Sequence, residues 1–285
     1  MRKELQQKCA AHFDLSILRW LPVAGGDINQ AFRLDTDRGA LFLKYQQSPV
    51  AAEMLRTEAR GLAELASAGA LRTPFVIGWQ ALTDQDACLL MEYIPSIPAG
   101  PKHHSALGQG LARLHRRTRP AYGWTENNFI GSLPQSNSDH KGAADFLRYE
   151  RLEPQWRAAR KSGFFSEKED QHFQDLLHSL PDRIPEERPA LIHGDLWSGN
   201  YLIDDRGHPV LIDPAVSYGP REMDLAMSRL FGGFSADFYT AYQAEWPLPA
   251  GYPDREPIYQ LYYLLVHVNL FGTAYTSSVR RILTS

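Results

Sequence analysis

Short runs that mix apolar, β-favouring residues with polar ones predict strands in the first third of the chain. Turn-forming Gly, Asp and Pro residues separate these runs. The predicted strands cover residues 15–21, 30–34, 40–45, 76–81 and 87–92. Between the third and fourth strands, residues 50–68 carry leucines at helical spacing, which predicts an amphipathic helix. The first part of the chain is therefore expected to form a small β-rich unit with one helix.

Helical periodicity dominates the rest of the chain. Pro95, Pro98 and Pro101 interrupt regular structure after the last predicted strand, so we place a domain boundary there, between residues 1–94 and 95–285. Helices are predicted in the larger unit over residues 105–117, 141–180, 235–244 and 258–271. The pattern therefore predicts an α+β fold in which a β-rich unit precedes a larger, mainly α-helical one.

The composition is that of a globular protein and excludes several function classes. Of 285 residues, 44% are hydrophobic and 22% are charged, and the net charge of −3 gives no basic surface for nucleic acid or an anionic membrane. No apolar run approaches the ~20 residues that span a bilayer, and no apolar segment follows the N-terminal basic residues, so we expect neither membrane nor secretory targeting. Cys9 and Cys88 are isolated in the sequence, which excludes a cysteine metal cluster and indicates the reducing cytoplasm. Nothing in the sequence indicates an obligate protein partner.

The residues best suited to chemistry gather in one loop and at the end of the next strand. An apolar run leads into His193-Gly-Asp195, Asn200 follows five residues later, and Asp213 closes a second apolar run. Kinases use one carboxylate to accept the proton of the attacking hydroxyl, and an amide oxygen and a second carboxylate to hold Mg²⁺ on the ATP phosphates. The spacing from Asp195 to Asn200 equals that of the kinase D-x-x-x-x-N loop. Each residue alone is an ordinary turn residue, but together they favour phosphoryl transfer.

Lys44 and Glu58 form a second candidate pair. Lys44 ends the third predicted strand, inside an apolar run where a lysine is costly to bury without a partner. Glu58 falls within the apolar stripe of the following helix, whereas Glu53 and Glu64 fall on the opposite face. This order matches the Lys–Glu ion pair that positions ATP phosphates in kinases. In the alternative, the lysine extends to solvent and the glutamate lies at the edge of the stripe.

The nucleotide-binding signals are weaker. Gly25 and Gly26 lie between two predicted strands, where paired glycines either let the backbone approach a phosphate or simply make a turn. The sequence has no G-x-x-x-x-G-K-[ST] and no G-x-G-x-x-G motif, so P-loop and Rossmann folds lose their main support. Met91, Glu92 and Tyr93 enter the proline-rich linker, where backbone groups are placed to meet an adenine, although Glu92 is equally well explained as a structural residue.

A long loop between residues 121 and 137 is rich in aromatic and amide side chains. Amides both donate and accept hydrogen bonds, so Asn128, Gln135 and Asn137 suit a polyhydroxylated substrate such as a sugar. Amides are also common structural residues in loops, and the sequence leaves both explanations open.

Taken in order, these segments resemble the fructosamine kinase (ketosamine kinase) family, relatives of the aminoglycoside phosphotransferases with a two-lobed, protein-kinase-like fold. The matching stretches, which run along nearly the whole chain, are Gly25-Gly-Asp-Ile-Asn-Gln-Ala-Phe32, Leu41-Phe-Leu-Lys44, Asn128-Phe-Ile-Gly-Ser-Leu-Pro-Gln135, His193-Gly-Asp-Leu-Trp-Ser-Gly-Asn200 and Asp213-Pro-Ala-Val-Ser-Tyr-Gly-Pro-Arg-Glu-Met-Asp224. His-Gly-Asp with a later Asp is shared by many small-molecule kinases. The Trp-Ser-Gly insertion and Asp-Pro-Ala are more specific to fructosamine kinases.

The resemblance implies ATP- and Mg²⁺-dependent phosphorylation of a sugar hydroxyl on a ketosamine or glycated amine or protein, typically at the 3′ position, which destabilises the adduct and favours deglycation. Asp195 would be the base, and Asn200 and Asp213 would hold Mg²⁺. The nucleotide contacts that it implies are Gly25, Gly26, Ile28, Lys44, Glu58, Met91, Glu92 and Tyr93. The substrate contacts would be Trp197, Asn128, Gln135 and Asn137.

Two departures from related kinases narrow the expectation. The glycine loop has no cysteine, so the disulfide-switched dimerisation of some eukaryotic members is not expected. Gly194 replaces the arginine of the protein kinase His-Arg-Asp motif, which argues against a protein kinase regulated by a phosphorylated activation loop.

Three alternatives remain. The acceptor would be an aminoglycoside, choline or another amino alcohol in the first, and the chain would be a non-catalytic nucleotide-binding scaffold in the second. The presence of the base, the lysine and both metal ligands argues against a scaffold. A metal-dependent hydrolase built on His193, Asp195 and Asp213 is disfavoured because further ligands at short spacing are scarce.

Overall fold

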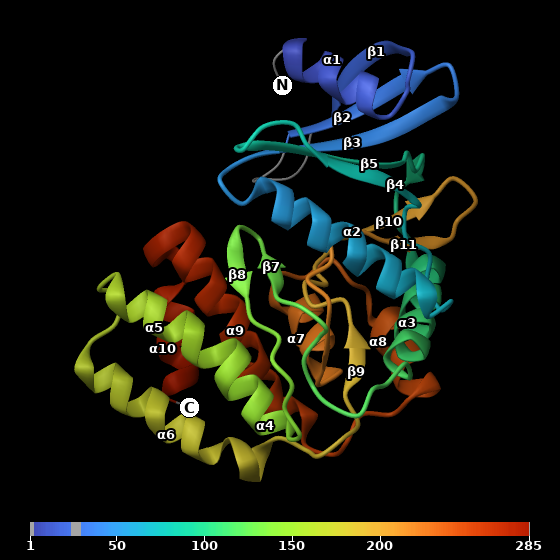
Figure 1. Cartoon of the computed structure of the whole chain (residues 1–285). Helices are drawn as coiled ribbons and strands as arrows, with labels where there is room; N and C mark the ends of the chain where they lie inside the picture. Colours follow the sequence, from blue (N-terminus) through green and yellow to red (C-terminus); the bar gives the residue numbers. More distant parts are fainter. Residues whose placement is uncertain (1–2, 24–29, 285) are drawn as a thin grey trace.

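The chain folds into a smaller and a larger unit, one stacked on the other (Figure 1). The computed structural model describes residues 3–23 and 30–284. The smaller unit, the N-terminal lobe, is built on a five-stranded antiparallel sheet with the strand order β1-β2-β3-β5-β4. Its strands are β1 (Ile17–Val23), β2 (Gln30–Thr36), β3 (Gly39–Gln47), β4 (Val76–Ala81) and β5 (Asp86–Glu92). Each of the five predicted strands is present, with bounds within two residues of the expected ones.

A helix that the sequence pattern did not predict, α1 (Lys3–His12), packs on this sheet through Leu5 and Cys9. Cys9 Sγ lies 3.7 Å from the Sγ of Cys88 in β5, and both side chains are buried. The contact with Cys9, together with burial, raises the pKa of Cys88. The two cysteines are isolated in the sequence but form a buried pair of free thiols in the fold.

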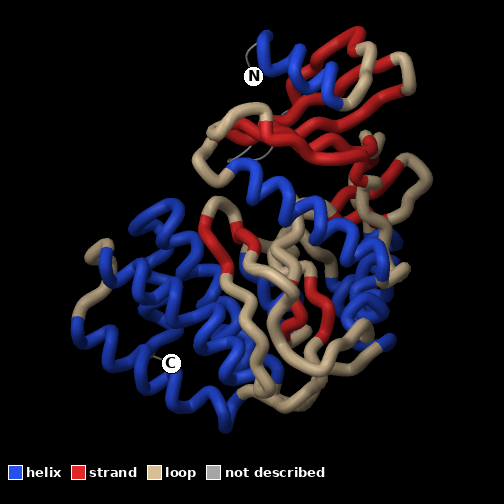
Figure 2. The backbone as a smooth tube through the Cα atoms, in the orientation of Figure 1, coloured by secondary structure: helices blue, strands red, loops and turns tan. Residues whose placement is uncertain are grey.

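Helix α2 (Ala51–Ser67) lies between the sheet and the larger unit (Figures 1 and 2). Its buried stripe of Leu55, Ala59 and Leu62 packs against Leu89 and Met91 of β5. The amphipathic helix predicted over residues 50–68 is therefore confirmed.

The larger unit, the C-terminal lobe, is mainly helical (Figure 2). Its helices are α3 (Pro101–His115), α4 (Ala143–Phe146), the π-helical turn η1 (Leu147–Leu152), α5 (Glu153–Lys161), α6 (Glu167–Arg183), α7 (Glu222–Leu230), α8 (Ala236–Glu245), α9 (Tyr252–Phe271), the 3₁₀ turn η2 (Gly272–Tyr275) and α10 (Thr276–Leu283). Its short strands are β6 (Ser96–Ile97), β7 (Asn128–Ile130), β8 (Leu133–Gln135), β9 (Ala190–Ile192), β10 (Tyr201–Asp204), β11 (Pro209–Leu211) and β12 (Ser217–Gly219). Strand β6 already pairs with β10 of this lobe. The exact boundary after residue 94 stays a prediction.

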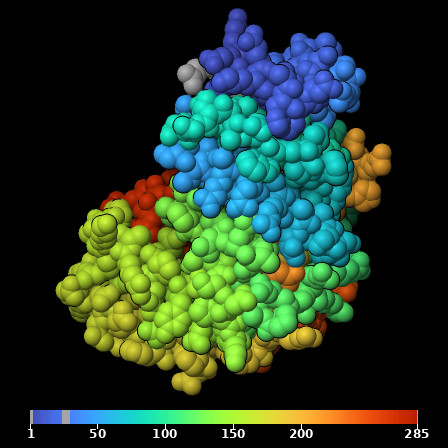
Figure 3. All heavy atoms as spheres, viewed as in Figure 1, coloured from blue at the N-terminus to red at the C-terminus, as the bar shows by residue number. Residues whose placement is uncertain are grey.

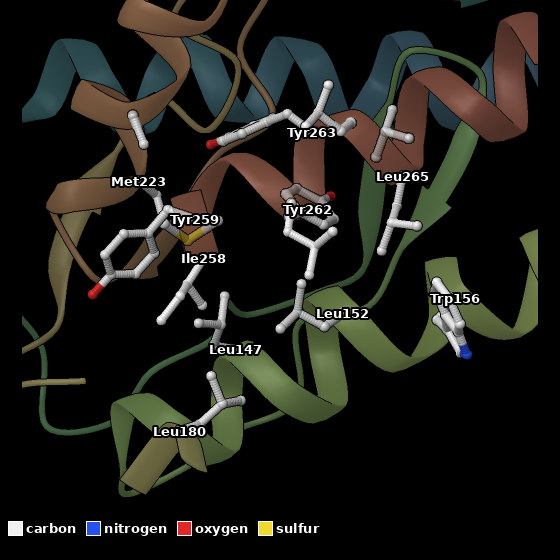
Figure 4. Close-up of a cluster of buried hydrophobic side chains, with 14 of the residues drawn as sticks. Leu147, Leu152, Trp156, Leu180, Met223, Ile258, Tyr259, Tyr262, Tyr263 and Leu265 are labelled. Carbon is white, nitrogen blue, oxygen red and sulfur yellow. The ribbon is translucent and has the colours of Figure 1, made fainter. Parts of the chain in front are cut away.

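Helix α9 is central to the larger hydrophobic core. Figure 4 shows Leu147 and Leu152 of η1 facing Ile258 and Tyr262 of α9, with Leu180 of α6 beyond them. None of the helices in the described ranges combines the length and the apolar character that crossing a membrane would need.

The stretch predicted to be helical, residues 141–180, is helical and is divided between α4, η1, α5 and α6. Gly163, with a left-handed φ of +78°, follows α5. The hydroxyl of Ser166 then caps α6 by accepting a hydrogen bond from the Glu169 N–H at 3.4 Å. A left-handed glycine and an N-cap serine therefore separate α5 from α6.

Candidate active site

Two short pairs of antiparallel strands present the predicted catalytic loop. Strand β9 pairs with β12 and delivers His193, while β10 pairs with β11 and delivers Asp213. The side-chain amide of Asn200 donates to Asp195 Oδ2 at 3.0 Å and to the backbone oxygen of Asp195 at 2.9 Å. Its contact with the backbone oxygen of Asp213 is longer, at 3.4 Å. The three polar side chains singled out in the sequence therefore lie together.

Lys44 brings the N-terminal lobe into this site. Its Nζ lies 2.8 and 3.0 Å from the two carboxylate oxygens of Glu58 and 2.8 Å from Asp213 Oδ1. The lysine side chain is only 7% exposed, so the alternative in which it extends to solvent is not what the structure shows. Burial opposes the charged lysine, but the charges of Asp213 and Glu58 outweigh it and raise the pKa of Lys44. Lys44 is therefore a cation shared by two carboxylates.

The surroundings of Asp195 disfavour the ionised form of its carboxyl group. Burial, reinforced by the nearby charge of Asp213, raises the pKa of Asp195 to about 7. A carboxylate with a pKa near neutral is suited to accept a proton and later release it at physiological pH.

The backbone of the loop explains why glycine stands at position 194. Gly194 has a φ of +83°, and a Cβ atom there would lie 2.0 Å from the backbone oxygen of Ala215. The position has room for no side chain, so the arginine of protein kinases is excluded by the local packing.

A buried carboxylate holds the start of the loop. Asp224 in α7 accepts hydrogen bonds from the backbone N–H groups of His193, at 2.7 Å, and Gly194, at 2.8 Å. The ring of His115 lies 3.1 Å from the same carboxylate. Although burial opposes ionisation, the contact with His115 and the loop N–H groups keeps the pKa of Asp224 below its ordinary value. Asp224 thus anchors the start of the loop.

His193 is a structural member of the loop. Its Nε2 lies 2.9 Å from the backbone oxygen of Ile212, and its Nδ1 lies 3.3 Å from the backbone nitrogen of Asp195. Burial lowers its pKa, so the ring is neutral at pH 7. The ring therefore links the Asp195 loop to the strand before Asp213.

The predicted adenine-binding segment consists of the last two residues of β5, Met91 and Glu92, and Tyr93 after it. Met91 is buried, and the Glu92 carboxylate pairs with Arg72 and accepts from the backbone N–H of Phe75 at 3.2 Å. The guanidinium of Arg33 lies over the Tyr93 ring, 4.9 Å from the ring centroid. The Glu92 side chain is thus held by contacts within the protein, and the contact of this segment with a nucleotide stays a prediction. Gly25, Gly26 and Ile28, also predicted to contact the nucleotide, lie outside the described residues.

The three loop amides are not at an open surface. Asn128, Gln135 and Asn137 are 5%, 2% and 2% exposed, and they hydrogen-bond to one another and to backbone carbonyls. Buried amides must find partners within the protein, and these three have them. Their contact with a sugar stays a prediction. They line the inner side of the Asp213 loop.

Trp197, in contrast, is 40% exposed beside Asp195. Its indole folds back over Gly199, where a Cβ atom would lie 2.3 Å from the ring. The turn after α7 covers the other side of the loop, since a Cβ atom at Gly233 would lie 2.4 Å from Cβ of Ser198. Trp197 is the predicted substrate contact that the fold leaves accessible.

Phe231, in the same turn, joins an aromatic cluster with residues of α9 and η2 that the sequence pattern did not predict. The His267 ring lies 4.7 Å from that of Phe231, 4.9 Å from Tyr275 and 5.6 Å from Phe271. Phe231 and Phe271 are 40% and 50% exposed. The aromatic residues after His267 were the available signal, but only the fold brings them together with Phe231.

Known proteins resemble this chain in sequence. The family model for fructosamine kinase matches residues 1–285. A protein of Enterococcus faecium named a probable ketoamine kinase is 41% identical over 92% of this chain and 93% of its own length. The chloroplastic protein-ribulosamine 3-kinase of Arabidopsis thaliana is 35% identical over 92% of this chain and 80% of its own.

Solved structures resemble the fold. A protein of Thermobifida fusca assigned as a fructosamine-3-kinase has a TM-score of 0.88 and 32% identity, with 96% of both chains covered. The aminoglycoside phosphotransferase APH(4)-Ia, solved as a variant with AMP-PNP and hygromycin B, has a TM-score of 0.68 with 99% of this chain and 98% of that chain covered. At 16% identity, this second likeness concerns the fold alone.

Proposed function

The chain belongs to the fructosamine kinase family, and on this premise we propose that it transfers the γ-phosphoryl group of ATP to a sugar hydroxyl of a ketosamine. The family resemblance and the two-lobed, protein-kinase-like fold predicted from the sequence are confirmed. The observation that carries the proposal is the convergence of Asp195, Asn200, Asp213 and Lys44 at the junction of the two lobes.

Asp195 is the proton acceptor in this proposal. The acceptor hydroxyl oxygen attacks the γ-phosphorus, the bond to the β–γ bridging oxygen breaks, and the hydroxyl proton passes to Asp195. Asn200 donates to Oδ2 of Asp195, whereas none of the described residues makes a hydrogen bond to Oδ1. Oδ1 is therefore the oxygen we assign to the hydroxyl.

Lys44 binds the phosphates, and Glu58 orients it. A triphosphate entering the site would bring negative charge to the ammonium that contacts Asp213. Glu58, whose side chain is 13% exposed, keeps Lys44 in place when that contact changes.

The residues present fit a magnesium ion. Asp213 offers a carboxylate that is 42% exposed. The Nδ2 of Asn200 is engaged by Asp195, so its amide oxygen points away from that carboxylate. Mg²⁺ prefers one or two such oxygen ligands together with substrate phosphates. Bound there, it would neutralise charge that develops on the transferred phosphoryl group.

We assign the sugar to the accessible side of the catalytic loop. Trp197 offers an indole face beside Asp195. The partly exposed cluster of Phe231, His267, Phe271 and Tyr275 in the same lobe offers further aromatic faces. Sugar C–H groups pack on such faces, and a protonated ketosamine nitrogen is attracted to them.

The finer details follow from relatives. The Arabidopsis relative is named a protein-ribulosamine 3-kinase, and we propose the 3′-hydroxyl as the acceptor here too. A 3′-phosphate destabilises the adduct, so the activity would serve deglycation. We also propose a cytoplasmic location, where ATP and Mg²⁺ are available.

The test is a substrate panel with purified protein, MgATP and lysine-bound ribulosamine or fructosamine, both as free adducts and on a protein. We expect one phosphoryl group on the ketosamine, located at the 3′ oxygen by ³¹P–¹H couplings, and none with Asp195→Asn. Transfer to aminoglycosides or choline but to no ketosamine would overturn the substrate assignment.

A further inference from the structure

Arg151 is a buried cation that the proposed chemistry does not use. It lies in the π-helical turn η1 and is 1% exposed. Its guanidinium donates to the backbone oxygens of Ser136 and Glu150 at 2.7 and 2.9 Å and stacks on Phe146, 4.4 Å from the ring centroid. Within residues 3–23 and 30–284, no carboxylate lies within ion-pair distance of it. Such a charge is costly to bury, and π-helical turns often mark functional sites.

The remaining hydrogen bond of Arg151 starts a chain of amides. Its Nη2 donates to Asn137 Oδ1 at 2.8 Å, and Asn137 Nδ2 donates to Asn128 Oδ1 at 2.8 Å. Asn128 Nδ2 then donates to the backbone oxygen of Val216 at 2.9 Å. A guanidinium only donates and a carbonyl only accepts, so the direction of every bond in between is determined.

A second chain of hydrogen bonds ends at the backbone oxygen of Ala215, one residue before Val216. The Tyr262 hydroxyl donates to Gln135 Oε1 at 2.6 Å, which turns the Gln135 amide nitrogen toward Asn128 Oδ1 at 2.8 Å and the backbone oxygen of Ala215 at 3.2 Å. Two adjacent carbonyls of one loop are therefore held from the inner side of the C-terminal lobe.

That loop carries the proposed metal ligand under backbone strain. Asp213 has a φ of +54°, one of two positive values among the non-glycine residues that the structure describes. Such a conformation persists only where surrounding contacts determine it. The restrained carbonyls follow Asp213 by two and three residues, with Pro214 between. Release of residues 215 and 216 would let Asp213 return to an ordinary conformation and turn its carboxylate.

We propose that Arg151, acting through Asn137, Asn128 and Gln135, is a positioning residue for Asp213 and holds its carboxylate ready for Mg²⁺ on the nucleotide. This inference rests on the proposed function, because it takes Asp213 as a magnesium ligand. It also gives the three amides a role within the protein.

The test separates magnesium from nucleotide binding. The dissociation constant of ADP is measured by calorimetry in Mg²⁺ and in EDTA, and the ratio of the two constants reports the contribution of the ion. Asn128→Asp is isosteric and removes the donor to Val216, and Arg151→Met removes the charge at the far end of the chain. Asn269→Asp is the matched control, because its Nδ2 donates to the backbone oxygen of Gln155 at 2.9 Å in a contact between α9 and α5.

We expect the magnesium ratio to fall about 10-fold in Asn128→Asp and Arg151→Met, as when the supporting shell of a metal site is altered. The constant in EDTA should stay within about threefold, and Asn269→Asp should keep the wild-type ratio while its melting temperature falls. Should Arg151→Met fail to fold, Asn128→Asp decides alone.

An unchanged ratio in Asn128→Asp, or an equal fall in Asn269→Asp, would overturn the proposal while leaving the kinase function intact. If the wild-type protein binds ADP equally well in Mg²⁺ and in EDTA, Asp213 has no role as a metal ligand and this inference is wrong as well. Phosphoryl transfer to a ketosamine is scored separately, so the two failures are distinguishable.

Discussion

The ammonium of Lys44 lies 2.8 Å from the Asp213 carboxylate, so strand β3 of one lobe and the loop after β11 of the other meet in a single ion pair. The same ammonium binds Glu58. The lysine that we propose to bind the phosphates therefore also neutralises the proposed metal ligand.

Lys44→Met should abolish turnover and destabilise the fold. It leaves Glu58 buried without a cation, which typically costs about 3 kcal/mol. The double variant Lys44→Met/Glu58→Gln removes that uncompensated charge, so we expect its melting temperature to recover while activity stays absent. Urea unfolding and ATP turnover measure the two effects. Equal stabilities for the single and double variants would contradict the buried pair.

Asp195→Asn should be inactive but more stable than the wild type at pH 8. The folded pKa of Asp195, about 7, lies above the value of an unfolded aspartate, so its contribution to stability is present at low pH and lost as the pH rises through 7. The asparagine carries no buried charge, and we expect a gain on the order of 2 kcal/mol at pH 8 that disappears near pH 4. Thermal unfolding at the two pH values checks it. A loss of stability at pH 8 would show that the charge is well solvated.

The same pKa predicts the acidic limb of the rate profile. Asp195 must be ionised to accept a proton, so kcat/KM for ATP should fall about tenfold per pH unit below 7. The charge of Mg²⁺ lowers a neighbouring carboxyl pKa, so the limb in kcat should lie at lower pH. Initial rates between about pH 5.5 and 9 measure the acidic limbs of both kcat/KM and kcat. A flat kcat/KM profile over this range would contradict the raised pKa.

Gly194→Ala should disrupt the catalytic loop. The new Cβ would lie 2.0 Å from the Ala215 carbonyl oxygen, in addition to its strained φ of +83°. Gly39→Ala is the control, since Gly39 has a φ of +103° and no atom within 4 Å of the added Cβ. We expect a loss of about 1–2 kcal/mol for Gly39→Ala, the cost of the backbone conformation, and at least twice that for Gly194→Ala. Chemical denaturation of both variants tests the difference.

Glu126→Gln should slow the reaction while leaving the fold nearly as stable. Glu126 of the C-terminal lobe contacts Arg56 at 2.7 Å and Arg60 at 2.6 Å, one on each side of Glu58 along α2. In Figure 3, α2 (light blue) touches the green segment of that lobe along this face. Partly exposed ion pairs contribute only about 0–1 kcal/mol to stability, but this one holds the helix that orients Lys44. We expect kcat to fall about threefold to tenfold.

The control for that prediction is Glu53→Gln, on the exposed side of the same helix. It should leave kcat unchanged. If both variants behave alike, Glu126 has no special part in placing α2.

Several features could be predicted because they depend on neighbouring residues. Period-2 and period-3.6 patterns identified the five strands and α2, and the spacing from Asp195 to Asn200 identified the catalytic loop. The position of Glu58 in the apolar stripe of α2 was also enough to indicate its partner Lys44. Helix α1 was missed because its apolar face becomes evident only once the sheet it covers is known.

The sequence by itself determined the elements, the order of the chemical groups and the family. Only the tertiary structure decided which polar residues face the site. It buried Asn128, Gln135 and Asn137 around Arg151 and left Trp197 accessible, although all are polar or aromatic residues of loops or turns. The physical reason is that burial and hydrogen-bond partners come from distant segments: Asn128 binds Val216, 88 residues away, and Cys9 meets Cys88, 79 residues away.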